Sequence, residues 1–311
     1  MRVAIVFPGQ GTQASGMGAP WQDHPAWKLV EQAEGALDEP LRHLVLDATD
    51  EQLARTRDAQ LAVLCTSLVA WEALRPLVDD VVAFAGHSLG QVSALIASGA
   101  LDLEDGVRFA ARRAELTQRA ADEHPGRMAA LLGATVEQAS EACNAAPDAC
   151  WIANDNAPGQ VVIAGTPEGL DLATARAKEL GVRRATALNV GGAFHTPLMA
   201  SAATGITAAL ADVAFEVPVA PIVANQDGAA YLTDDTWNGD SWRERSAAHV
   251  TMPVRWRTSM ETLAALGADA CIEVGYGSMI AGLAKRAVPG TPVFSCSNPS
   301  DLDNLAKGLA S

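Results

Sequence analysis

Short apolar runs that end in glycine-rich turns predict strands of a buried parallel sheet. Val3–Phe7 is one such run, and it stops at Pro8-Gly9. Val81–Ala85 is another, and Gly86–Gly90 separates it from Val92–Ala97, an apolar stretch with small residues that predicts a buried helix. Strand, tight turn and buried helix in this order are typical of parallel α/β domains.

The segment 127–190 has a different order of elements. Its pattern predicts, in chain order, a strand over Met128–Leu132, a helix over Thr135–Ala145, strands over Cys150–Ala153 and Gln160–Ala164, a helix over Thr166–Leu180 and a strand over Arg184–Val190. Thr135 and Thr166 are suited to cap the two helices, and Gly181 to end the second. The order β-α-β-β-α-β is that of a ferredoxin-like unit.

The α/β pattern continues on both sides of this segment. It predicts helices over Gln60–Leu77, Ser201–Ala211 and Ser278–Arg286, and strands over Ala220–Ala224 and Ala270–Val274. The predicted fold class is therefore α/β: a parallel-sheet, α/β-hydrolase-like large domain from residues 1–126 and 191–311, with an inserted ferredoxin-like small domain over 127–190.

Composition narrows the class of protein. Of 311 residues 49% are hydrophobic, which excludes a disordered chain, and 22 basic against 37 acidic residues give a net charge of −15. This balance argues against nucleic-acid binding, and no apolar stretch is long enough to span a membrane. The odd number of cysteines (five), without metal-like spacing, indicates buried thiols in a reducing compartment. The first apolar run is too short for a signal peptide. We expect a cytoplasmic enzyme.

The sequence Gly86-His87-Ser88-Leu89-Gly90 matches the G-x-S-x-G pattern. Between a strand and a helix, this pattern forms a sharp turn that presents the serine hydroxyl, with the next backbone N–H facing a developing oxyanion. The alternative is a purely structural glycine turn. The predicted strand before the motif and helix after it favour Ser88 as a nucleophile.

A serine nucleophile needs a base. Of six histidines, His87 should point away from its neighbour Ser88 in a tight turn, whereas His195 follows a predicted strand and a flexible glycine pair. From the residues alone, a buried structural histidine remains the alternative for His195. The glycine-rich loop Phe7–Gln13 lacks the spacings of phosphate-binding loops, and the backbone near Gln10 better fits a second source of oxyanion donors.

Together these motifs resemble those of the malonyl-CoA:acyl carrier protein transacylases and the related acyltransferase domains of polyketide synthases. The resemblance covers nearly the whole chain. Its landmarks, in the family's order, are Phe7–Gln13, Gly86–Gly90, Arg112-Arg113, Asn156–Gly165, Gly192–Thr196, Pro253–Trp256 and Ile272–Gly275.

The resemblance implies a role for each matching residue. Ser88 would be acylated by malonyl-CoA, with His195 Nε2 as the general base, oriented by the backbone carbonyl of His249 instead of an acid. The amides of Gln10 and Leu89 would form the oxyanion hole. The acceptor would be the phosphopantetheine thiol of an acyl carrier protein, in fatty-acid or polyketide synthesis, and no metal or redox cofactor is implied.

Two further residues concern the acyl group. Arg113 matches the arginine that holds the free malonyl carboxylate, which a planar guanidinium can bind bidentately. The alternative is a solvated helix charge, and either Arg112 or Arg113 should be one. Phe194, beside the base, resembles malonyl-specific relatives and leaves little room for an α-methyl group; its alternative is core packing.

The chain departs from the family pattern at three positions. His249 stands where Gln is usual, Gln91 where Glu is frequent, and Ala114 where Gly is frequent. None removes a chemical group from the implied mechanism. They leave open whether the chain serves a fatty-acid, a polyketide or another carrier-protein pathway.

Two rival functions share part of these features. A serine hydrolase or thioesterase would use the same serine and base with water, and a catalytically inactive docking module would bind a carrier protein alone. A carrier protein and CoA are both anionic, so this acidic chain needs a local basic patch. The candidate clusters are Arg183-Arg184, Arg243 with Arg245, Arg255 with Arg257, and Lys285-Arg286.

Overall fold

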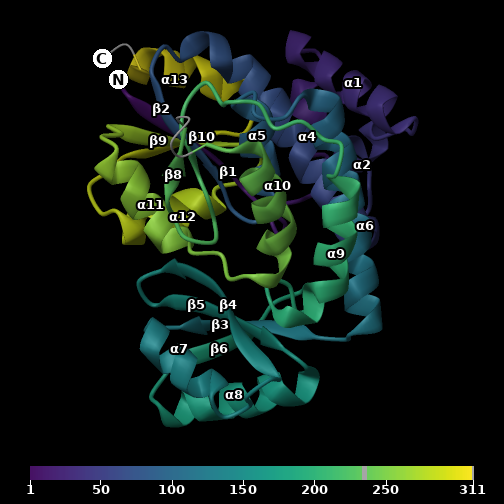
Figure 1. The fold of residues 1–311 in the computed structure, drawn as a ribbon. Helices are drawn as coiled ribbons and strands as arrows, with labels where there is room; N and C mark the ends of the chain where they lie inside the picture. Colours follow the sequence, from purple (N-terminus) through teal and green to yellow (C-terminus); the bar gives the residue numbers. More distant parts are fainter. Residues whose placement is uncertain (233–236, 310–311) are drawn as a thin grey trace.

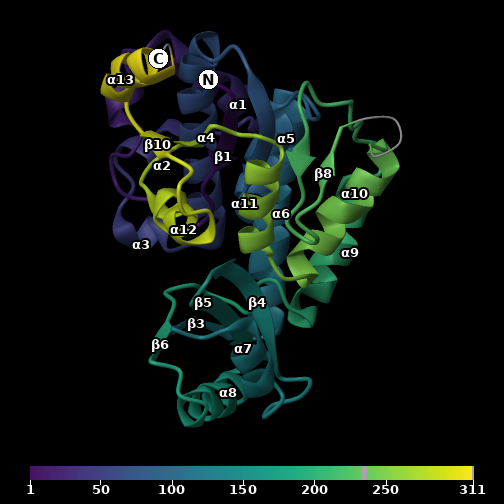
Figure 2. The same cartoon turned by 90° about the vertical axis from the view of Figure 1, so that its left-hand side faces the viewer.

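Two sheets organise the computed structural model, which describes residues 1–232 and 237–309 (Figures 1 and 2). The larger has the order β10-β9-β1-β2-β7-β8. Its strands are β1 (Val3–Phe7), β2 (Val81–Gly86), β7 (Ile222–Val223), β8 (Ala230–Tyr231), β9 (Ala270–Val274) and β10 (Val293–Cys296). All neighbours pair in parallel except β7 and β8.

Helices cover both faces of this sheet. Its helices are α1 (Lys28–Leu37), α2 (Arg42–Leu46), α3 (Asp50–Leu53), α4 (Thr56–Leu74), α5 (Gly90–Ala97), α6 (Leu103–Glu123), α9 (Ala200–Ala209), α10 (Gly239–Ala248), α11 (Trp256–Ala265), α12 (Met279–Ala287) and α13 (Ser300–Leu309). Short 3-10 segments lie at Ala19–Trp21, Pro25–Trp27, Arg75–Leu77, Pro197–Met199 and His249–Thr251.

Strand β1 shows why its sequence is apolar throughout. Ile5 and Phe7 pack into the core formed with α4, α5 and α6, whereas Ala4 and Val6 pack on the other face against α11 and α12. Alternate residues of a strand point to opposite faces, and here both faces are buried. The carboxyl ends of β1 and β2 consequently lie in the interior, where the chain turns into glycine-rich loops.

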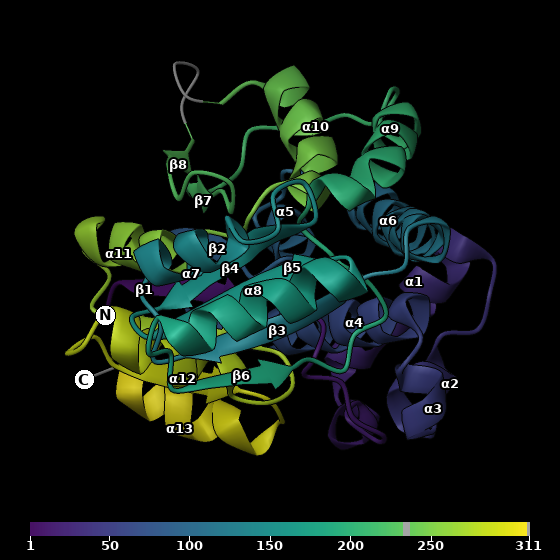
Figure 3. The ribbon, with the colours of Figure 1, turned by 90° about the horizontal axis from the view of Figure 1, so that it is seen from below.

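The smaller sheet is antiparallel, with the order β4-β5-β3-β6. Its elements are β3 (Arg127–Leu132), α7 (Val136–Cys143), β4 (Cys150–Ala157), β5 (Gln160–Gly165), α8 (Pro167–Glu179) and β6 (Arg184–Ala187). Helices α7 and α8 cover its outer face, as the view from below shows (Figure 3). Thr135 and Thr166 cap these helices as predicted. The other face lies toward the large sheet.

The predicted fold class is confirmed, because a parallel sheet and a separate ferredoxin-like sheet are both present. The domain boundaries at 126/127 and 190/191 stay a prediction. Two predicted strands are shorter in the structure: Arg184–Val190 ends at Ala187, and Ala220–Ala224 is reduced to Ile222–Val223.

Strand β4 is longer than predicted and continues through the polar residues 154–157. Asp155 pairs with β5 and also donates its backbone N–H to the carbonyl of Val254, and its carboxylate pairs with Arg257. The end of β4 therefore connects the small sheet to the segment Val254–Arg257 at the start of α11. This contact places the small sheet against the carboxyl ends of the large one.

The structure can be compared with two predictions made from the composition: the burial of the cysteines and the lack of a stretch long enough to span a membrane. All five cysteines are buried free thiols. Among the helices of residues 1–232 and 237–309, none combines the length and apolar character needed to cross a bilayer.

Candidate active site

The turn between β2 and α5 holds Ser88 in a left-handed backbone conformation, with φ of 53°. This turn needs glycine on both sides of the serine. A Cβ on Gly86 would lie 1.9 Å from the backbone of Gly90, and one on Gly90 would lie 2.3 Å from the carbonyl oxygen of Phe7. Since a strained backbone persists only where its surroundings fix it, the tight packing of β1 against this turn holds the serine out into a cavity.

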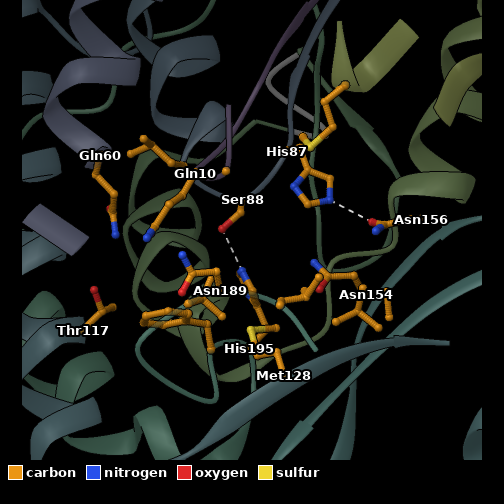
Figure 4. Close-up of a pocket in the computed structure, with 18 of the residues that line it drawn as sticks. Gln10, Gln60, His87, Ser88, Thr117, Met128, Asn154, Asn156, Asn189 and His195 are labelled. Carbon is orange, nitrogen blue, oxygen red and sulfur yellow. Dashed lines mark hydrogen bonds between the residues drawn. The ribbon is translucent and has the colours of Figure 1, made fainter. Parts of the chain in front are cut away.

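His195 faces Ser88 across this cavity (Figure 4). Its Nε2 lies 2.7 Å from Ser88 Oγ, and its Nδ1 lies 3.0 Å from the carbonyl oxygen of His249 and 3.1 Å from that of Met252. A carbonyl can only accept a hydrogen bond, so Nδ1 carries the proton and Nε2 presents its lone pair to the hydroxyl. This tautomer is the one that a general base requires.

The base is kept neutral by its surroundings. Burial of the ring and, to a smaller extent, the positive charge of Arg113 together lower the pKa of His195 to about 3. The two carbonyl hydrogen bonds oppose this shift only partly. His195 is therefore unprotonated, and able to accept a proton, throughout the neutral pH range.

Arg113 points into the same cavity from α6. Its Nη1 donates to Gln60 Oε1 at 2.6 Å and its Nη2 to Ser88 Oγ at 3.3 Å, whereas its buried Nε has no partner among the described residues. Burial lowers its pKa to about 10, which leaves the guanidinium charged at neutral pH. Arg112 is exposed and pairs with Glu115. Of the adjacent arginines, only Arg113 is in the cavity.

The cavity has a volume of about 440 Å³ and lies between the two sheets. Phe194, Gln10 and Leu89 line it together with the residues above. Met128 and Val162, from β3 and β5, contribute an apolar wall on the side of the small sheet. A cavity of this volume, with an apolar wall and a few polar groups, is typical of a small-molecule site.

Two backbone N–H groups at the cavity are available to a ligand. The amides of Gln10 and Leu89 have no hydrogen-bond partner within residues 1–232 and 237–309. The loop of Gln10 lies against the serine turn, because a Cβ on Gly9 would be only 2.4 Å from the carbonyl oxygen of His87. Two unpaired amides at the serine are the arrangement that stabilises an oxyanion.

The structure also brings in residues that the sequence analysis did not assign. Gln60 fixes Arg113, and Asn225 Oδ1 accepts a hydrogen bond from the backbone N–H of Ser88 at 2.8 Å. His87 turns away from Ser88, as expected, and its Nε2 lies 2.8 Å from Asn156 Oδ1 of β4. Asn156 lies in the landmark segment Asn156–Gly165, which gave a signal in the sequence, but nothing marked Gln60 or Asn225.

Among the described residues, no group of three His, Cys, Asp or Glu side chains is placed to hold a metal ion.

Comparison with known proteins gives consistent results. Residues 4–293 match the model of the acyl transferase domain family. The chain is 36% identical over 304 residues to a malonyl CoA-acyl carrier protein transacylase of Escherichia coli K12, covering 96% of each chain. It also resembles the acyl-carrier-protein S-malonyltransferase of Bartonella henselae, with 31% identity, full coverage of both chains and a TM-score of 0.93.

A further solved structure contains a partner. It is described as a type II polyketide synthase acyl-carrier protein in complex with its malonyl-transacylase, and this chain is 30% identical to it. The match covers 99% of this chain and 100% of the other, with a TM-score of 0.93.

Proposed function

Because this chain belongs to the malonyl-CoA:acyl carrier protein transacylase family of acyl transferases, we propose that it moves a malonyl group from malonyl-CoA to the phosphopantetheine thiol of an acyl carrier protein. The observation that carries this proposal is the convergence of Ser88, His195 and Arg113 on one cavity. The first two supply acyl transfer, and the third supplies a charge for the second carboxylate of malonyl.

The first half-reaction acylates the enzyme. Ser88 Oγ attacks the thioester carbonyl while His195 Nε2 takes its proton, and the amides of Gln10 and Leu89 hold the negative oxygen of the tetrahedral intermediate. The C–S bond then breaks, and His195 returns the proton to the leaving CoA sulfur. The product is a malonyl ester on Ser88.

The second half-reaction follows the same path in reverse. The carrier thiol gives its proton to His195 and attacks the ester carbonyl, and the C–O bond to Ser88 breaks as the proton returns to Oγ. Because CoA leaves before the carrier protein reacts, the kinetics should be ping-pong.

Arg113 gives the site its selectivity in this scheme. Its unpaired Nε and its Nη2 are two donors on one edge of the guanidinium, and they match the two oxygens of a carboxylate. A monoacyl group such as acetyl leaves this buried charge without a partner, which is unfavourable by about 2–4 kcal/mol.

The basic residues of the candidate docking clusters differ in whether an acidic side chain pairs with them. Arg243 pairs with Asp240, Arg245 with Asp227, and Arg257 with Asp155. Those cations are already neutralised. Among the described residues, no ion pair engages the exposed side chains of Arg183, Arg184, Arg255 and Lys285-Arg286.

Three of these cations, Arg183, Arg184 and Arg286, lie near the rim of the cavity. Arg184 pairs across the sheet with Leu132, which also pairs with Gln160, a residue that lines the cavity. Arg286 donates to the side chain of Gln160, and Arg183 packs against Gly133 next to Leu132. This rim is the surface on which we place the anionic carrier protein.

The decisive experiment measures the covalent intermediate. Mixing the protein with malonyl-CoA should give a malonyl adduct by intact-protein mass spectrometry, and Ser88→Ala should abolish it. Ser93→Ala is a matched control, because Ser93 is a buried serine of the following helix outside the cavity lining. An adduct that survives Ser88→Ala would refute the assignment. An adduct that hydrolyses within seconds in buffer would favour the rival hydrolase.

A further inference from the structure

Two of the positions where the chain departs from the family pattern, Gln91 and His249, contact each other below the active site. Gln91 Nε2 lies 3.5 Å from His249 Nδ1, although the residues are 158 positions apart. Both side chains are buried, with 1% and 2% of their surface exposed. The pair is therefore part of the interior that supports the cavity.

Asn225 connects this pair to the nucleophile. Its backbone N–H donates to Gln91 Oε1 at 2.8 Å, and its side-chain Nδ2 donates to the carbonyl of Gly86 at 2.8 Å. Its Oδ1 accepts from the backbone N–H of Ser88 and lies 3.1 Å from His249 Nε2. Asn225 thereby holds Gly86, the first residue of the turn, and Ser88, its left-handed residue.

The hydrogen bonds allow one proton arrangement. Asn225 Oδ1 is an acceptor, so His249 Nε2 must donate to it, and His249 Nδ1 then presents a lone pair to the amide group of Gln91. In this arrangement the ring of His249 is neutral and its ring nitrogens both have partners. An imidazolium would place a second N–H against the N–H₂ of Gln91.

His249 also acts on the base. Its backbone carbonyl accepts from His195 Nδ1, and the two rings lie with their centroids 5.1 Å apart. A charge on His249 would therefore oppose the protonation of His195 that each half-reaction requires. A neutral neighbour leaves His195 free to take a proton.

We propose that Gln91, Asn225 and His249 are positioning residues, which fix the Ser88 turn and hold a neutral second imidazole beside His195. This inference rests on the proposed function for its catalytic consequence. The identity of residue 91 is the critical choice, since an amide at this position can donate to His249 Nδ1 and a carboxylate cannot.

Other charges around His249 are few. Burial is the main reason that the pKa of His249 lies well below its usual value. The ionisable groups that act on the ring are His195, Arg113 and His87, and each of them also disfavours a positive charge on it. Helix α9 carries no ionisable residue, and in α10 Arg243 and Arg245 are ion-paired away from the ring while Glu244 is exposed.

The test replaces the amide with a carboxylate. In Gln91→Glu, Oε1 still accepts from Asn225, but the second oxygen faces the lone pair of His249, so a proton must be added to one of the two groups. We expect the second-order rate constant for malonylation of Ser88 to fall about tenfold or more, and its pH profile to gain an ionisation absent from the unmodified protein. Gln32→Glu, an exposed change of the same kind on α1, is the control.

A second substitution separates positioning from a general loss of stability. In Gln91→Glu with His249→Gln, the new amide can donate to the carboxylate and cannot ionise. The double variant should recover most of the rate lost in Gln91→Glu and lose the added ionisation. The inference is wrong if Gln91→Glu keeps the original rate and pH profile. It is also wrong if the double variant is slower than expected from multiplying the rate reductions measured separately for Gln91→Glu and His249→Gln.

A measurement that needs no activity keeps the inference separate from the proposed function. Long-range ¹H–¹⁵N spectra of histidine-labelled protein should show His249 as the neutral Nε2–H tautomer from pH 8 to pH 5, with its signals assigned by His249→Gln. A ring that titrates near its ordinary pKa would overturn the inference. Absence of the malonyl adduct in the unmodified protein would instead overturn the proposed function.

Discussion

Arg113 and Ser88 are in direct contact: Nη2 of the guanidinium lies 3.3 Å from the hydroxyl oxygen. The charge of Arg113 also lowers the pKa of His195. A malonyl carboxylate bound to Arg113 would cancel this charge and make His195 a stronger base. Acetyl would not. Selectivity should therefore appear in the rate of acylation as well as in binding.

Arg113→Ala should reduce the preference for malonyl-CoA over acetyl-CoA about a hundredfold, which corresponds to roughly 3 kcal/mol for a buried charge-assisted contact. The measurement is the ratio of adduct formation rates with the two acyl-CoAs. Arg112→Ala is the matched control, because that neighbouring side chain is exposed and pairs with Glu115. An unchanged ratio in Arg113→Ala would remove the residue from the selectivity mechanism.

Phe194→Ala should widen the range of acyl groups. Phe194 lines the cavity beside His195, and truncating its ring makes room for an α-methyl group. One methyl group is worth about 1–3 kcal/mol in a closely fitting pocket, so the rate with methylmalonyl-CoA relative to malonyl-CoA should rise about tenfold. If both rates fall in equal proportion, Phe194 is a packing residue only.

The acylation step should be insensitive to mild acid. A histidine with an ordinary pKa near 6.5 would be mostly protonated at pH 5.5 and lost as a base. Since the pKa of His195 is lowered to about 3, its basic form persists as the pH falls. The rate constant for adduct formation should stay constant between pH 8 and pH 5, and a drop centred near pH 6.5 would show that the pKa of His195 is not lowered.

Several parts of the site could be predicted because local sequence determines them. The turn of Ser88 follows from the strand, the two glycines and the helix that surround it. The choice of Arg113 over Arg112 also has a local signal. The residues four before and three after Arg112 are the charged Arg108 and Glu115, whereas Arg113 has Phe109 and Leu116 at these spacings, on the buried face of α6. Periodicity alone could have separated the two arginines.

Other parts depend on contacts that no local pattern encodes. Asn225 follows a strand of two residues, and it reaches Ser88 only because β7 pairs in parallel with β2. The predicted strand Cys150–Ala153 stopped short of the end of β4, because the pairing of Asn154 with Val254 joins segments that are 100 residues apart in the sequence and no local pattern marks it. The role of such residues becomes visible only when both sheets are in place.

The buried histidines should make the fold sensitive to acid. His195 and His249 have lowered pKa values in the folded state, so between pH 6.5 and the folded pKa the unfolded chain binds protons that the folded chain does not. The free energy of unfolding must then fall as the pH falls, by about 1.4 kcal/mol per pH unit for each group.

This prediction is checked by urea unfolding at pH 7 and at pH 5.5. His249→Gln removes one of the two titrating rings and should reduce the loss of stability attributable to the pair by about half. His43→Gln, on an exposed histidine of α2, should leave the loss unchanged. An equal loss in His249→Gln and in the unmodified protein would show that His249 does not contribute.

Charge reversal at the cavity rim should weaken the reaction with the carrier protein. Replacing Arg184 by Glu puts a negative charge where an anionic partner approaches, so the KM for the carrier protein should rise severalfold at low salt, and its dependence on salt should weaken. Lys307→Glu is the matched control, because this exposed lysine lies on α13, at the end of the molecule away from the small sheet (Figure 1). A carrier KM that changes equally in both variants would reflect net charge alone and would exclude the rim as the docking surface.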